Sequence, residues 1–392
     1  MNRWSILIGY SFLAASTQIL WITFAPITTE SAQVMHTSVA NVSDLAAIFQ
    51  LVYILLALPT GRWLDRRFPS ALTAGALFTG LGGLLRVLNP YSFPFQLLAQ
   101  TIVAVGQPLV LNGITKLAAL HFPPEERATA ISVGSASIFL GILLAMFSGP
   151  LLYAQGGLPL VLWVQALFAL VAMIWAILAA RTRPAYTVAE EPQGLGWLRG
   201  DRFMWRLAIL LFLGFGIFIA LSTWMQTILA FFHVGDTESG DLLALMTFTG
   251  ILGSALLPPL VSSRNARRGM ILLSLVVTGL GLFAVAWLHE PLWLALWFAL
   301  SGFFLLANLP IVLDWAERHA GSGRQGSAVG FLMLAGMTGG LVLVLLDQAV
   351  IGSPYASLGV LLIAVVVALI LSLGLPHRVE ARTGLVEEPE SA

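Results

Sequence analysis

The alternation of apolar and polar segments divides this chain into long apolar runs separated by short polar breaks. A helix needs roughly 20 residues to cross the ~30 Å hydrocarbon core of a bilayer. Apolar runs of that size lie near residues 5–27, 43–61, 70–89, 94–117, 128–153, 158–180, 204–232, 241–261, 269–288, 292–315, 327–350 and 355–375. Turn residues or charges mark the breaks, as in NPYSFP at 89–94 and GSP at 352–354. The pattern predicts an all-α integral membrane protein with twelve transmembrane helices.

The longest polar stretch between runs, RTRPAYTVAEEPQGLGWLRGDR at 181–202, joins six runs to six. We therefore expect two six-helix bundles. Their predicted bounds are 1–180 and 204–376, with a cytoplasmic linker at 181–203 and a cytoplasmic tail at 377–392. The N-terminal MNRWSILIGYSFLAAS has the composition of a signal peptide, but its apolar run continues to Pro26, which is long enough to span. We expect a retained first helix.

Three features recur between the two halves at a common offset of about 200 residues. They are an arginine pair after the second and eighth runs (Arg66 and Arg67, Arg267 and Arg268), an amide close to a proline in runs four and ten (Gln107 and Pro108, Asn308 and Pro310), and a tryptophan in runs one and seven (Trp21 and Trp224). The recurrence indicates pseudo-symmetric halves. Secondary transporters are built from such repeats and hold their substrate near the membrane midplane between them.

Composition and charge narrow the class of protein and set its orientation. The chain is 58% hydrophobic and 10% charged, whereas soluble domains carry about 25% charged residues. Its net charge of zero argues against a nucleic-acid partner, and with no cysteine it has no disulfide or thiolate site. With cytoplasmic termini, 18 of the 19 Lys and Arg residues fall on the cytoplasmic side and only Arg86 lies near the other. We expect a multi-pass protein of the cell (inner or plasma) membrane, with both termini cytoplasmic.

The loop after the second run reads GRWLDRR, with Gly61, Asp65 and Arg66 in the pattern G-x-x-x-D-[RK]. Together with six plus six helices, this motif resembles the major facilitator superfamily, although the later glycine of the family signature is missing. Gly61 allows close helix approach, Asp65 can lie at the positive N-terminus of a neighbouring helix, and the arginines can pair across a cytoplasmic gate. An ordinary positive-inside loop is the alternative. The candidate gating residues are Gly61, Asp65, Arg66, Arg67, Arg267 and Arg268.

A narrower resemblance appears in QPLVLNGITKLAALHFPPEERATAISVG at 107–134, and extends to QILWITFAPI at 18–27 and IFQLVYILLALPTGRWLD at 48–65. These segments are similar to the feline leukaemia virus subgroup C receptor-related transporters. The resemblance implies movement of choline-like cations, with haem also proposed for the family. It also implies a pocket in which Trp21 and Gln107 contact the substrate. The family's helix 7 aromatic lies near Phe218, and its helix 11 glutamine has no match here.

Polar and aromatic side chains inside the apolar runs supply the remaining candidates. In the fold that the resemblance implies, helices 1, 4, 7 and 10 line a central cavity, where an amide meets water or substrate rather than lipid. The candidate substrate contacts are Trp21, Gln107, Gln18, Asn112, Phe218, Gln226 and Asn308. The alternatives are interhelical hydrogen bonding for the amides and an interfacial belt position for the tryptophan. Pro108 and Pro310 are expected to kink their helices and to free the carbonyls of Ala104 and Leu306.

The apolar runs lack the ionisable side chains that usually couple transport to protons. No Asp, Glu or His lies clearly at mid-depth, and Asp347 is expected to pair with Arg86 at the outer face rather than to carry a proton. The sequence shows no enzyme-like constellation of catalytic side chains. We expect a monomeric, cofactor-free carrier in the lipid bilayer that moves a small-molecule substrate by alternating access. A facilitator of choline-like amines is the leading hypothesis, and a proton-coupled efflux pump for drugs or other lipophilic metabolites is the alternative.

Overall fold

The computed structural model describes residues 2–186, 196–321 and 324–376, and within them every regular element is a helix. The predicted tail at 377–392 and part of the predicted linker lie outside these residues. In chain order the helices are α1 (Arg3–Trp21), the short η1 (Ala25–Ile27), α2 (Thr28–Val34), α3 (Val39–Leu88), α4 (Phe93–Leu111), α5 (Ile114–His121), α6 (Arg127–Ala180), α7 (Gly196–Gly200), α8 (Arg202–Phe231), α9 (Asp236–Ser263), α10 (Arg267–Val285), α11 (Pro291–Leu305), α12 (Asn308–Ala320), α13 (Gln325–Gln348) and α14 (Pro354–Leu373).

Twelve membrane crossings are present, as predicted. Ten helical segments of the described chain are long and apolar enough to span. Two of them, α3 with 50 residues and α6 with 54, are twice the usual length because each bends back on itself. The bend in α3 lies at Arg67, where φ is −144° and ψ is 65°. The bend in α6 lies at Gly156 and Gly157, and the φ of +65° at Gly157 is one that favours glycine.

Two spans are interrupted near proline, one in each half. The fourth span consists of α4 and α5, which are separated by a turn at Asn112 and Gly113, one turn after Pro108. The tenth span consists of α11 and α12, which are separated at 306–307, just before Pro310 in the first turn of α12. Proline has no N–H and leaves the carbonyl one turn before it without its helical bond. For Pro310 that carbonyl belongs to Leu306, in the break itself, whereas α4 continues through Pro108 to Leu111. Discontinuous helices at corresponding positions are the usual setting of substrate sites in transporters.

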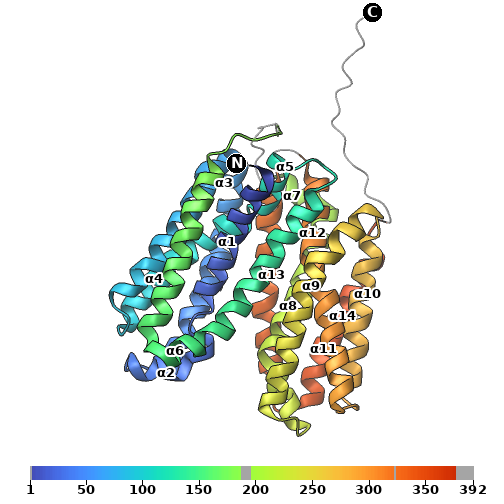
Figure 1. The fold of residues 1–392 in the computed structure, drawn as a ribbon. Helices are drawn as coiled ribbons and strands as arrows, with labels where there is room; N and C mark the ends of the chain where they lie inside the picture. Colours follow the sequence, from blue (N-terminus) through green and yellow to red (C-terminus); the bar gives the residue numbers. More distant parts are fainter. Residues whose placement is uncertain (1, 187–195, 322–323, 377–392) are drawn as a thin grey trace, which may run out of the picture.

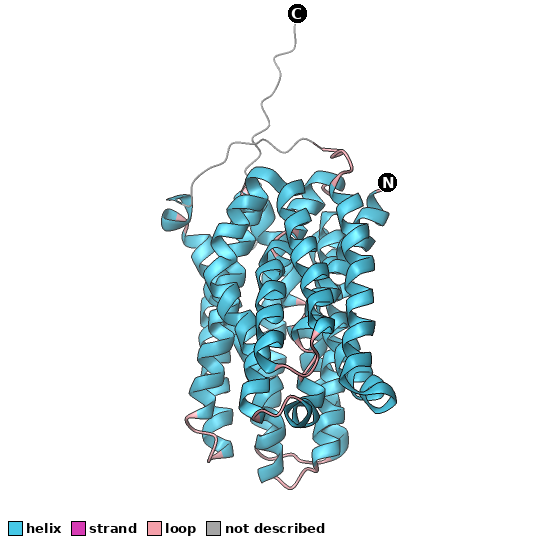
Figure 2. Cartoon of the chain, turned by 90° about the vertical axis from the view of Figure 1, so that its left-hand side faces the viewer, coloured by secondary structure: helices cyan, strands magenta, loops and turns pink. Residues whose placement is uncertain are grey.

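The helices form two bundles that lie side by side (Figure 1). Helices α1 to α6 make the first and α8 to α14 the second, and the long axes of the spans run roughly parallel (Figure 2). We call the end at which α1 begins and α14 ends the terminal face. At this face Arg3 pairs with Glu126 at 2.7 Å, and Arg206 donates to the carbonyl of Gly374 at 2.6 Å. In Figure 1 the bundles converge at the terminal face and diverge toward the opposite face.

Side-chain caps fix where the helices begin at the terminal face. Asn2 accepts a hydrogen bond from the amide of Ser5 at the start of α1. Asp201 accepts from the amides of Phe203 and Met204 at the start of α8, and its other oxygen meets the ring of His319 at 2.7 Å. Burial acts to raise the pKa of Asp201, but the donors at Met204 and His319 outweigh it, so the pKa lies below its ordinary value. Asp201 therefore ties α8 to the end of α12 as an anion.

Candidate functional site

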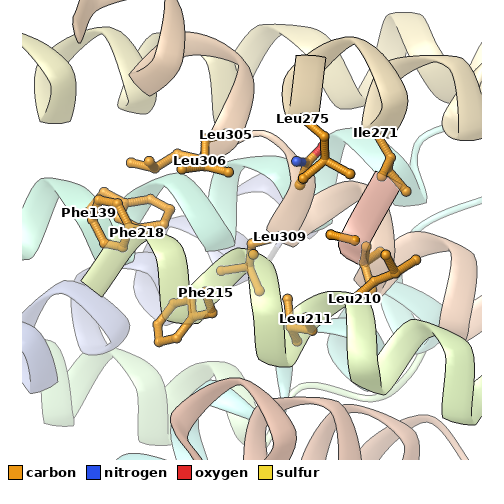
Figure 3. Close-up of a pocket in the computed structure, with 14 residues that line it drawn as sticks. Phe139, Leu210, Leu211, Phe215, Phe218, Ile271, Leu275, Leu305, Leu306 and Leu309 are labelled. Carbon is orange, nitrogen blue, oxygen red and sulfur yellow. The ribbon is translucent and has the colours of Figure 1, made fainter. Parts of the chain in front are cut away.

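A cavity lies where the interrupted tenth span faces α8, and it holds about 520 Å³ of empty space, part of it open to solvent. Figure 3 shows its lining. The side chains are almost all apolar: Phe139 from α6, Leu210, Leu211, Phe215 and Phe218 with Gly214 from α8, Ile271 and Leu275 from α10, Leu305, Leu306, Leu309 and Val312 with Asn308 from the tenth span, and Ala368 from α14. Within the part of the chain that the structure describes, no charged side chain lines it. The cavity therefore favours a ligand with an apolar body that is either uncharged or carries a diffuse, weakly hydrated positive charge.

Three aromatic rings line one side of this cavity, at mid-depth in their helices. Phe139 and Phe218 meet edge to face, with ring centroids 5.9 Å apart, and Phe215 follows at 6.3 Å from Phe218. Phe139 belongs to the first bundle and Phe218 to the second. The cavity consequently lies against the interface between the bundles, where a relative movement of the two would change its shape. Figure 3 shows Phe139, Phe215 and Phe218 grouped on the same side of the cavity.

Asn308 is the polar side chain of the cavity, and it has a free acceptor. Its amide nitrogen donates to the hydroxyl of Ser274 on α10 at 2.8 Å. Its carbonyl oxygen is buried and has no hydrogen-bond partner in the described chain. An unsatisfied buried acceptor carries a free-energy cost, which a bound donor relieves. Asn308 thus leaves one buried acceptor unsatisfied beside this cavity.

Of the seven predicted substrate contacts, the structure brings Phe218 and Asn308 into this cavity and places the other five elsewhere. Asn112 is fully engaged between helices: it accepts from the Tyr53 hydroxyl at 2.7 Å and donates to the Ala57 carbonyl and to Thr60. Its amide links the fourth span to α3 and thus has the alternative role considered above, interhelical hydrogen bonding. No sequence signal separated it from Asn308.

The other predicted contacts lie in the first bundle or on the outside of α8. Gln107 is buried in α4, and its amide makes no hydrogen bond within the residues described. Gln18 is buried and donates to Thr17 at 3.0 Å, and Trp21 is half-buried and donates to the carbonyl of Ala46 on α3 at 3.0 Å. Gln226 is exposed on α8. Phe139 and Phe215, which do line the cavity, were not predicted, because a phenylalanine in an apolar span looks the same whether it faces lipid or a cavity.

The bundles are joined at the terminal face by the loop residues of the motif. Asp65 of α3 accepts hydrogen bonds from the backbone amides of Gly326 and Ser327, at 2.6 and 2.8 Å, and from the Ser327 hydroxyl. These amides are the first of α13, where the helix dipole favours a carboxylate. Gly61 lies against Gly326 so closely that an added Cβ would meet the Gly326 carbonyl at 2.5 Å. The two glycines allow α3 and α13 to touch.

Among the described residues, Arg66, Arg67 and Arg267 do not pair across this junction as we expected. Arg66 and Arg67 are exposed, because the turn of the helix that points Asp65 at α13 points them outward. Arg267 is buried and pairs with Asp314 of its own bundle at 2.6 Å, and Arg268 lies half-buried beside it. An ion pair that does cross between the bundles is made by Arg127 at the start of α6, which lies 3.1 Å from Glu317 of α12.

The expected pair of Arg86 with Asp347 is wrong. Arg86 is 1% exposed and lies over the ring of Phe24, with its guanidinium carbon 5.2 Å from the ring centroid. Asp347 is fully buried beside the hydroxyl of Ser357 on α14, and it forms no ion pair with Arg86 or with any other described residue. The sequence indicates that the two residues lie at a similar depth in the membrane. They do not meet, because each is buried inside its own bundle.

Comparison with known proteins agrees with the helical arrangement. The family model described as Major Facilitator Superfamily matches residues 6–344 and 227–390. Solute carrier family 49 member A3 of Danio rerio is 32% identical over 275 residues, which cover 65% of this chain and 58% of that relative's length. The choline/ethanolamine transporter FLVCR2 of Homo sapiens is 22% identical over 372 residues, which cover 87% of this chain and 70% of the relative.

Solved structures show the same fold. A bacterial homologue of the iron transporter ferroportin, in an outward-facing state, superposes with a TM-score of 0.74 at 15% identity, covering 95% of this chain and 98% of that one. At this identity the likeness concerns the fold alone. The family match spans most of the sequence, and the twelve crossings and paired bundles described above are those of its fold. The chain belongs to the major facilitator superfamily and is a secondary transporter.

Proposed function

We propose that this transporter moves a choline-like amine, and that the amine binds in the cavity between α8 and the tenth span. The observation that carries the proposal is the pairing of three phenylalanine rings with the free carbonyl oxygen of Asn308. Aromatic faces attract quaternary ammonium groups by cation–π interaction, worth about 0.5–2 kcal/mol. The hydroxyl of choline, or the ammonium and hydroxyl of ethanolamine, supplies the hydrogen bond that Asn308 lacks. The similarity to human FLVCR2, a choline/ethanolamine transporter, supports the same class of substrate.

Transport is proposed to proceed by alternating access. The contacts that support this are the ones that hold the bundles together at the terminal face, namely Asp65 with the start of α13 and Arg127 with Glu317. With that face cytoplasmic, this conformation is closed to the cytoplasm by these contacts. Return of the empty or loaded carrier requires these contacts to separate while the opposite ends close. Trp21 and Gln107, which lie in the first bundle, are proposed to meet the substrate when the bundles close.

Uptake by purified protein in liposomes tests the substrate. Radiolabelled choline is offered outside, with the membrane potential set by potassium and valinomycin. We expect saturable uptake that rises with an inside-negative potential, because the moving species is a cation. Phe218→Ala should weaken transport about twofold to thirtyfold through the lost cation–π contact, whereas Gln226→Ala on the same helix should not change it. No uptake above that of empty liposomes, or equal uptake by the Phe218 and Gln226 variants, would refute the assignment.

A proton-coupled efflux pump for lipophilic compounds is the second candidate, and one observation favours it. Asp347 is buried in α13 beside the hydroxyl of Ser357 and forms no ion pair with a described side chain, and buried carboxylates of this kind serve as proton carriers in transporters. The two functions differ in their energy source. A protonophore applied at constant membrane potential should leave choline uptake unchanged for a facilitator and abolish accumulation for a proton-coupled pump.

A further inference from the structure

A basic groove lies at the terminal end of the first limb of α3, on the outside of the molecule. It is lined by Pro59, Arg62, Trp63, Arg66 and Arg67, so that three of its five residues carry a positive charge. The substrate cavity does not include any of them. We refer to these five residues as the basic groove.

Helical spacing separates the basic groove from the contact between bundles. Ala57, Gly61 and Asp65 recur every four residues and face α13, where Gly61 and Asp65 meet Gly326 and Ala57 meets Gly330. Residues 59, 62, 63 and 66 recur at spacings of three, four and seven, so they share the other face of the same helix. One face therefore joins the bundles, and the other is free to meet the surroundings of the protein.

The three arginines of the groove have no anionic partner among the residues described. Other arginines of the terminal face do have one: Arg3 pairs with Glu126, Arg127 with Glu317, and Arg318 with Asp314. The groove arginines lie at the same face of the protein as these three, yet no carboxylate of the described chain lies within ion-pair distance of them. Three uncompensated guanidinium groups around one hollow form a receptor for an external anion.

The position of Trp63 indicates where that anion comes from. Trp63 is 40% exposed, and its indole nitrogen donates to the hydroxyl of Ser70 at 3.2 Å, which fixes the ring at the edge of the groove. Tryptophan with an apolar ring and an anchored nitrogen is typical of the headgroup level of a bilayer. Arginine binds phosphate with two parallel N–H donors, which suits a lipid phosphodiester.

We propose that the basic groove binds the headgroup of an anionic phospholipid in the leaflet at the terminal face. The phosphodiester lies among Arg62, Arg66 and Arg67, and the acyl chains run beside Trp63 and Pro59. Arg67 is also the bend of α3, and Asp65 comes two residues earlier. A bound lipid therefore holds the bend that presents Asp65 to α13. This site is independent of the substrate cavity and of the substrate proposed for it.

Native mass spectrometry of the purified full chain tests this site. The protein in detergent is titrated with phosphatidylglycerol and, separately, with phosphatidylcholine, and bound lipid is counted. We expect phosphatidylglycerol to bind first and to raise the unfolding temperature. A triple variant, Arg62→Gln with Arg66→Gln and Arg67→Gln, should lose that binding, since each arginine near a membrane surface contributes about fivefold in affinity. Single variants should each weaken it about fivefold.

The matched control removes the same charge from the same face outside the groove. Arg181→Gln with Arg183→Gln and Arg199→Gln changes three exposed arginines and should bind phosphatidylglycerol like the parent. Equal loss in both triple variants would show that only net charge matters and would overturn the proposal. So would equal affinity for phosphatidylcholine, or full protection of the parent protein by inorganic phosphate, which would identify a soluble-anion site. If the triple variant does not fold, unchanged binding in the three single variants would overturn the proposal in the same way.

Discussion

Two asparagines in interrupted spans have opposite environments. The side-chain oxygen of Asn112 accepts from Tyr53, and its nitrogen donates to Ala57 and Thr60, so that all three hydrogen bonds go to α3. Asn308 bonds to Ser274 with its nitrogen and keeps its oxygen free at the edge of the cavity. The same residue type, at the same kind of helix break, is structural in one half and available to a ligand in the other. The difference is that Tyr53 donates a hydrogen bond to the amide oxygen of Asn112, whereas no described residue donates one to the oxygen of Asn308.

Asn308→Ala should weaken choline transport and leave folding nearly intact. The substitution removes one acceptor for the ligand, which is worth about 0.5–1.5 kcal/mol, so the KM for choline should rise about twofold to tenfold with little change in kcat. Initial uptake rates at several choline concentrations measure it. A parental KM in Asn308→Ala would show that the substrate does not use this oxygen.

Asn112→Ala should act the other way, through stability. Removal of the amide leaves the buried Tyr53 hydroxyl unpaired, which costs about 1–3 kcal/mol of unfolding free energy. Thermal unfolding in detergent should show a lowered midpoint, while the KM of the protein that remains folded stays near the parental value. A raised KM at unchanged stability would move Asn112 into the substrate site.

The sequence predicted residue types better than residue roles. Polar positions inside apolar runs identified both asparagines, and the seven-residue candidate set included Phe218 and Asn308. Their roles depend on which helix lies opposite, and this is a tertiary property. Phe139 was missed because its ring gives no sign of facing Phe218 until two bundles are placed against each other. Arg86 and Asp347 were paired on depth alone, and depth does not fix the bundle in which a side chain points.

At the scale of elements, the start of α13 and the bend of α3 form one unit. Asp65 satisfies two of the amides that a helix N-terminus leaves unpaired, and the Gly61 and Gly326 contact brings the backbones within reach. The motif GRWLDRR, together with the positive-inside bias, predicted a loop with an acid near a helix start. It did not predict that Arg66 and Arg67 face outward. Their direction follows from the fact that α3 stays helical up to its bend at Arg67, which the sequence suggested would be a loop.

Asp65→Asn should loosen the terminal face. Loss of the negative charge at the α13 N-terminus is worth about 0.3–2 kcal/mol, so the population open at that face should increase about twofold to thirtyfold. The chain has no cysteine, so a cysteine introduced at Leu64, which is fully buried against Gly326, is a clean reporter. Its rate of labelling by a maleimide should rise with Asp65→Asn. The matched control is Asp44→Asn, an exposed carboxylate on the same helix; equal rates in both variants would contradict the role given to Asp65.

At the scale of the whole molecule, twelve crossings place both described chain ends at one face. Composition and run length predicted this arrangement well, since the hydrocarbon thickness fixes the length of a span and the two long helices each divide at a bend. The conformation could not be predicted in the same way. The bundles can meet at the terminal face or at the opposite face, and the free-energy difference between these two conformations depends on the contacts at both ends. The pattern of apolar runs is the same for both conformations, so it does not distinguish them.

The orientation of the protein in its membrane can be measured by direct labelling. Arginine and lysine gather on the terminal face, so we expect that face to be cytoplasmic. A single cysteine at Tyr91, which is 54% exposed between α3 and α4, should react with a membrane-impermeant maleimide added to intact cells. A cysteine at Arg264, exposed between α9 and α10, should react only after the cells are permeabilised. The reverse pattern would invert the proposed direction of opening.

Distances between the bundles, measured at both faces, test the central claim most directly. Spin labels at Glu125 and Arg264 span the terminal face, and labels at Tyr91 and Leu292 span the opposite face; all four positions are exposed. In liposomes, saturating choline should lengthen the first distance in part of the population and shorten the second in the same proportion. If both distances change in the same direction, or neither changes while the same sample transports choline, then the two bundles do not alternate around this cavity.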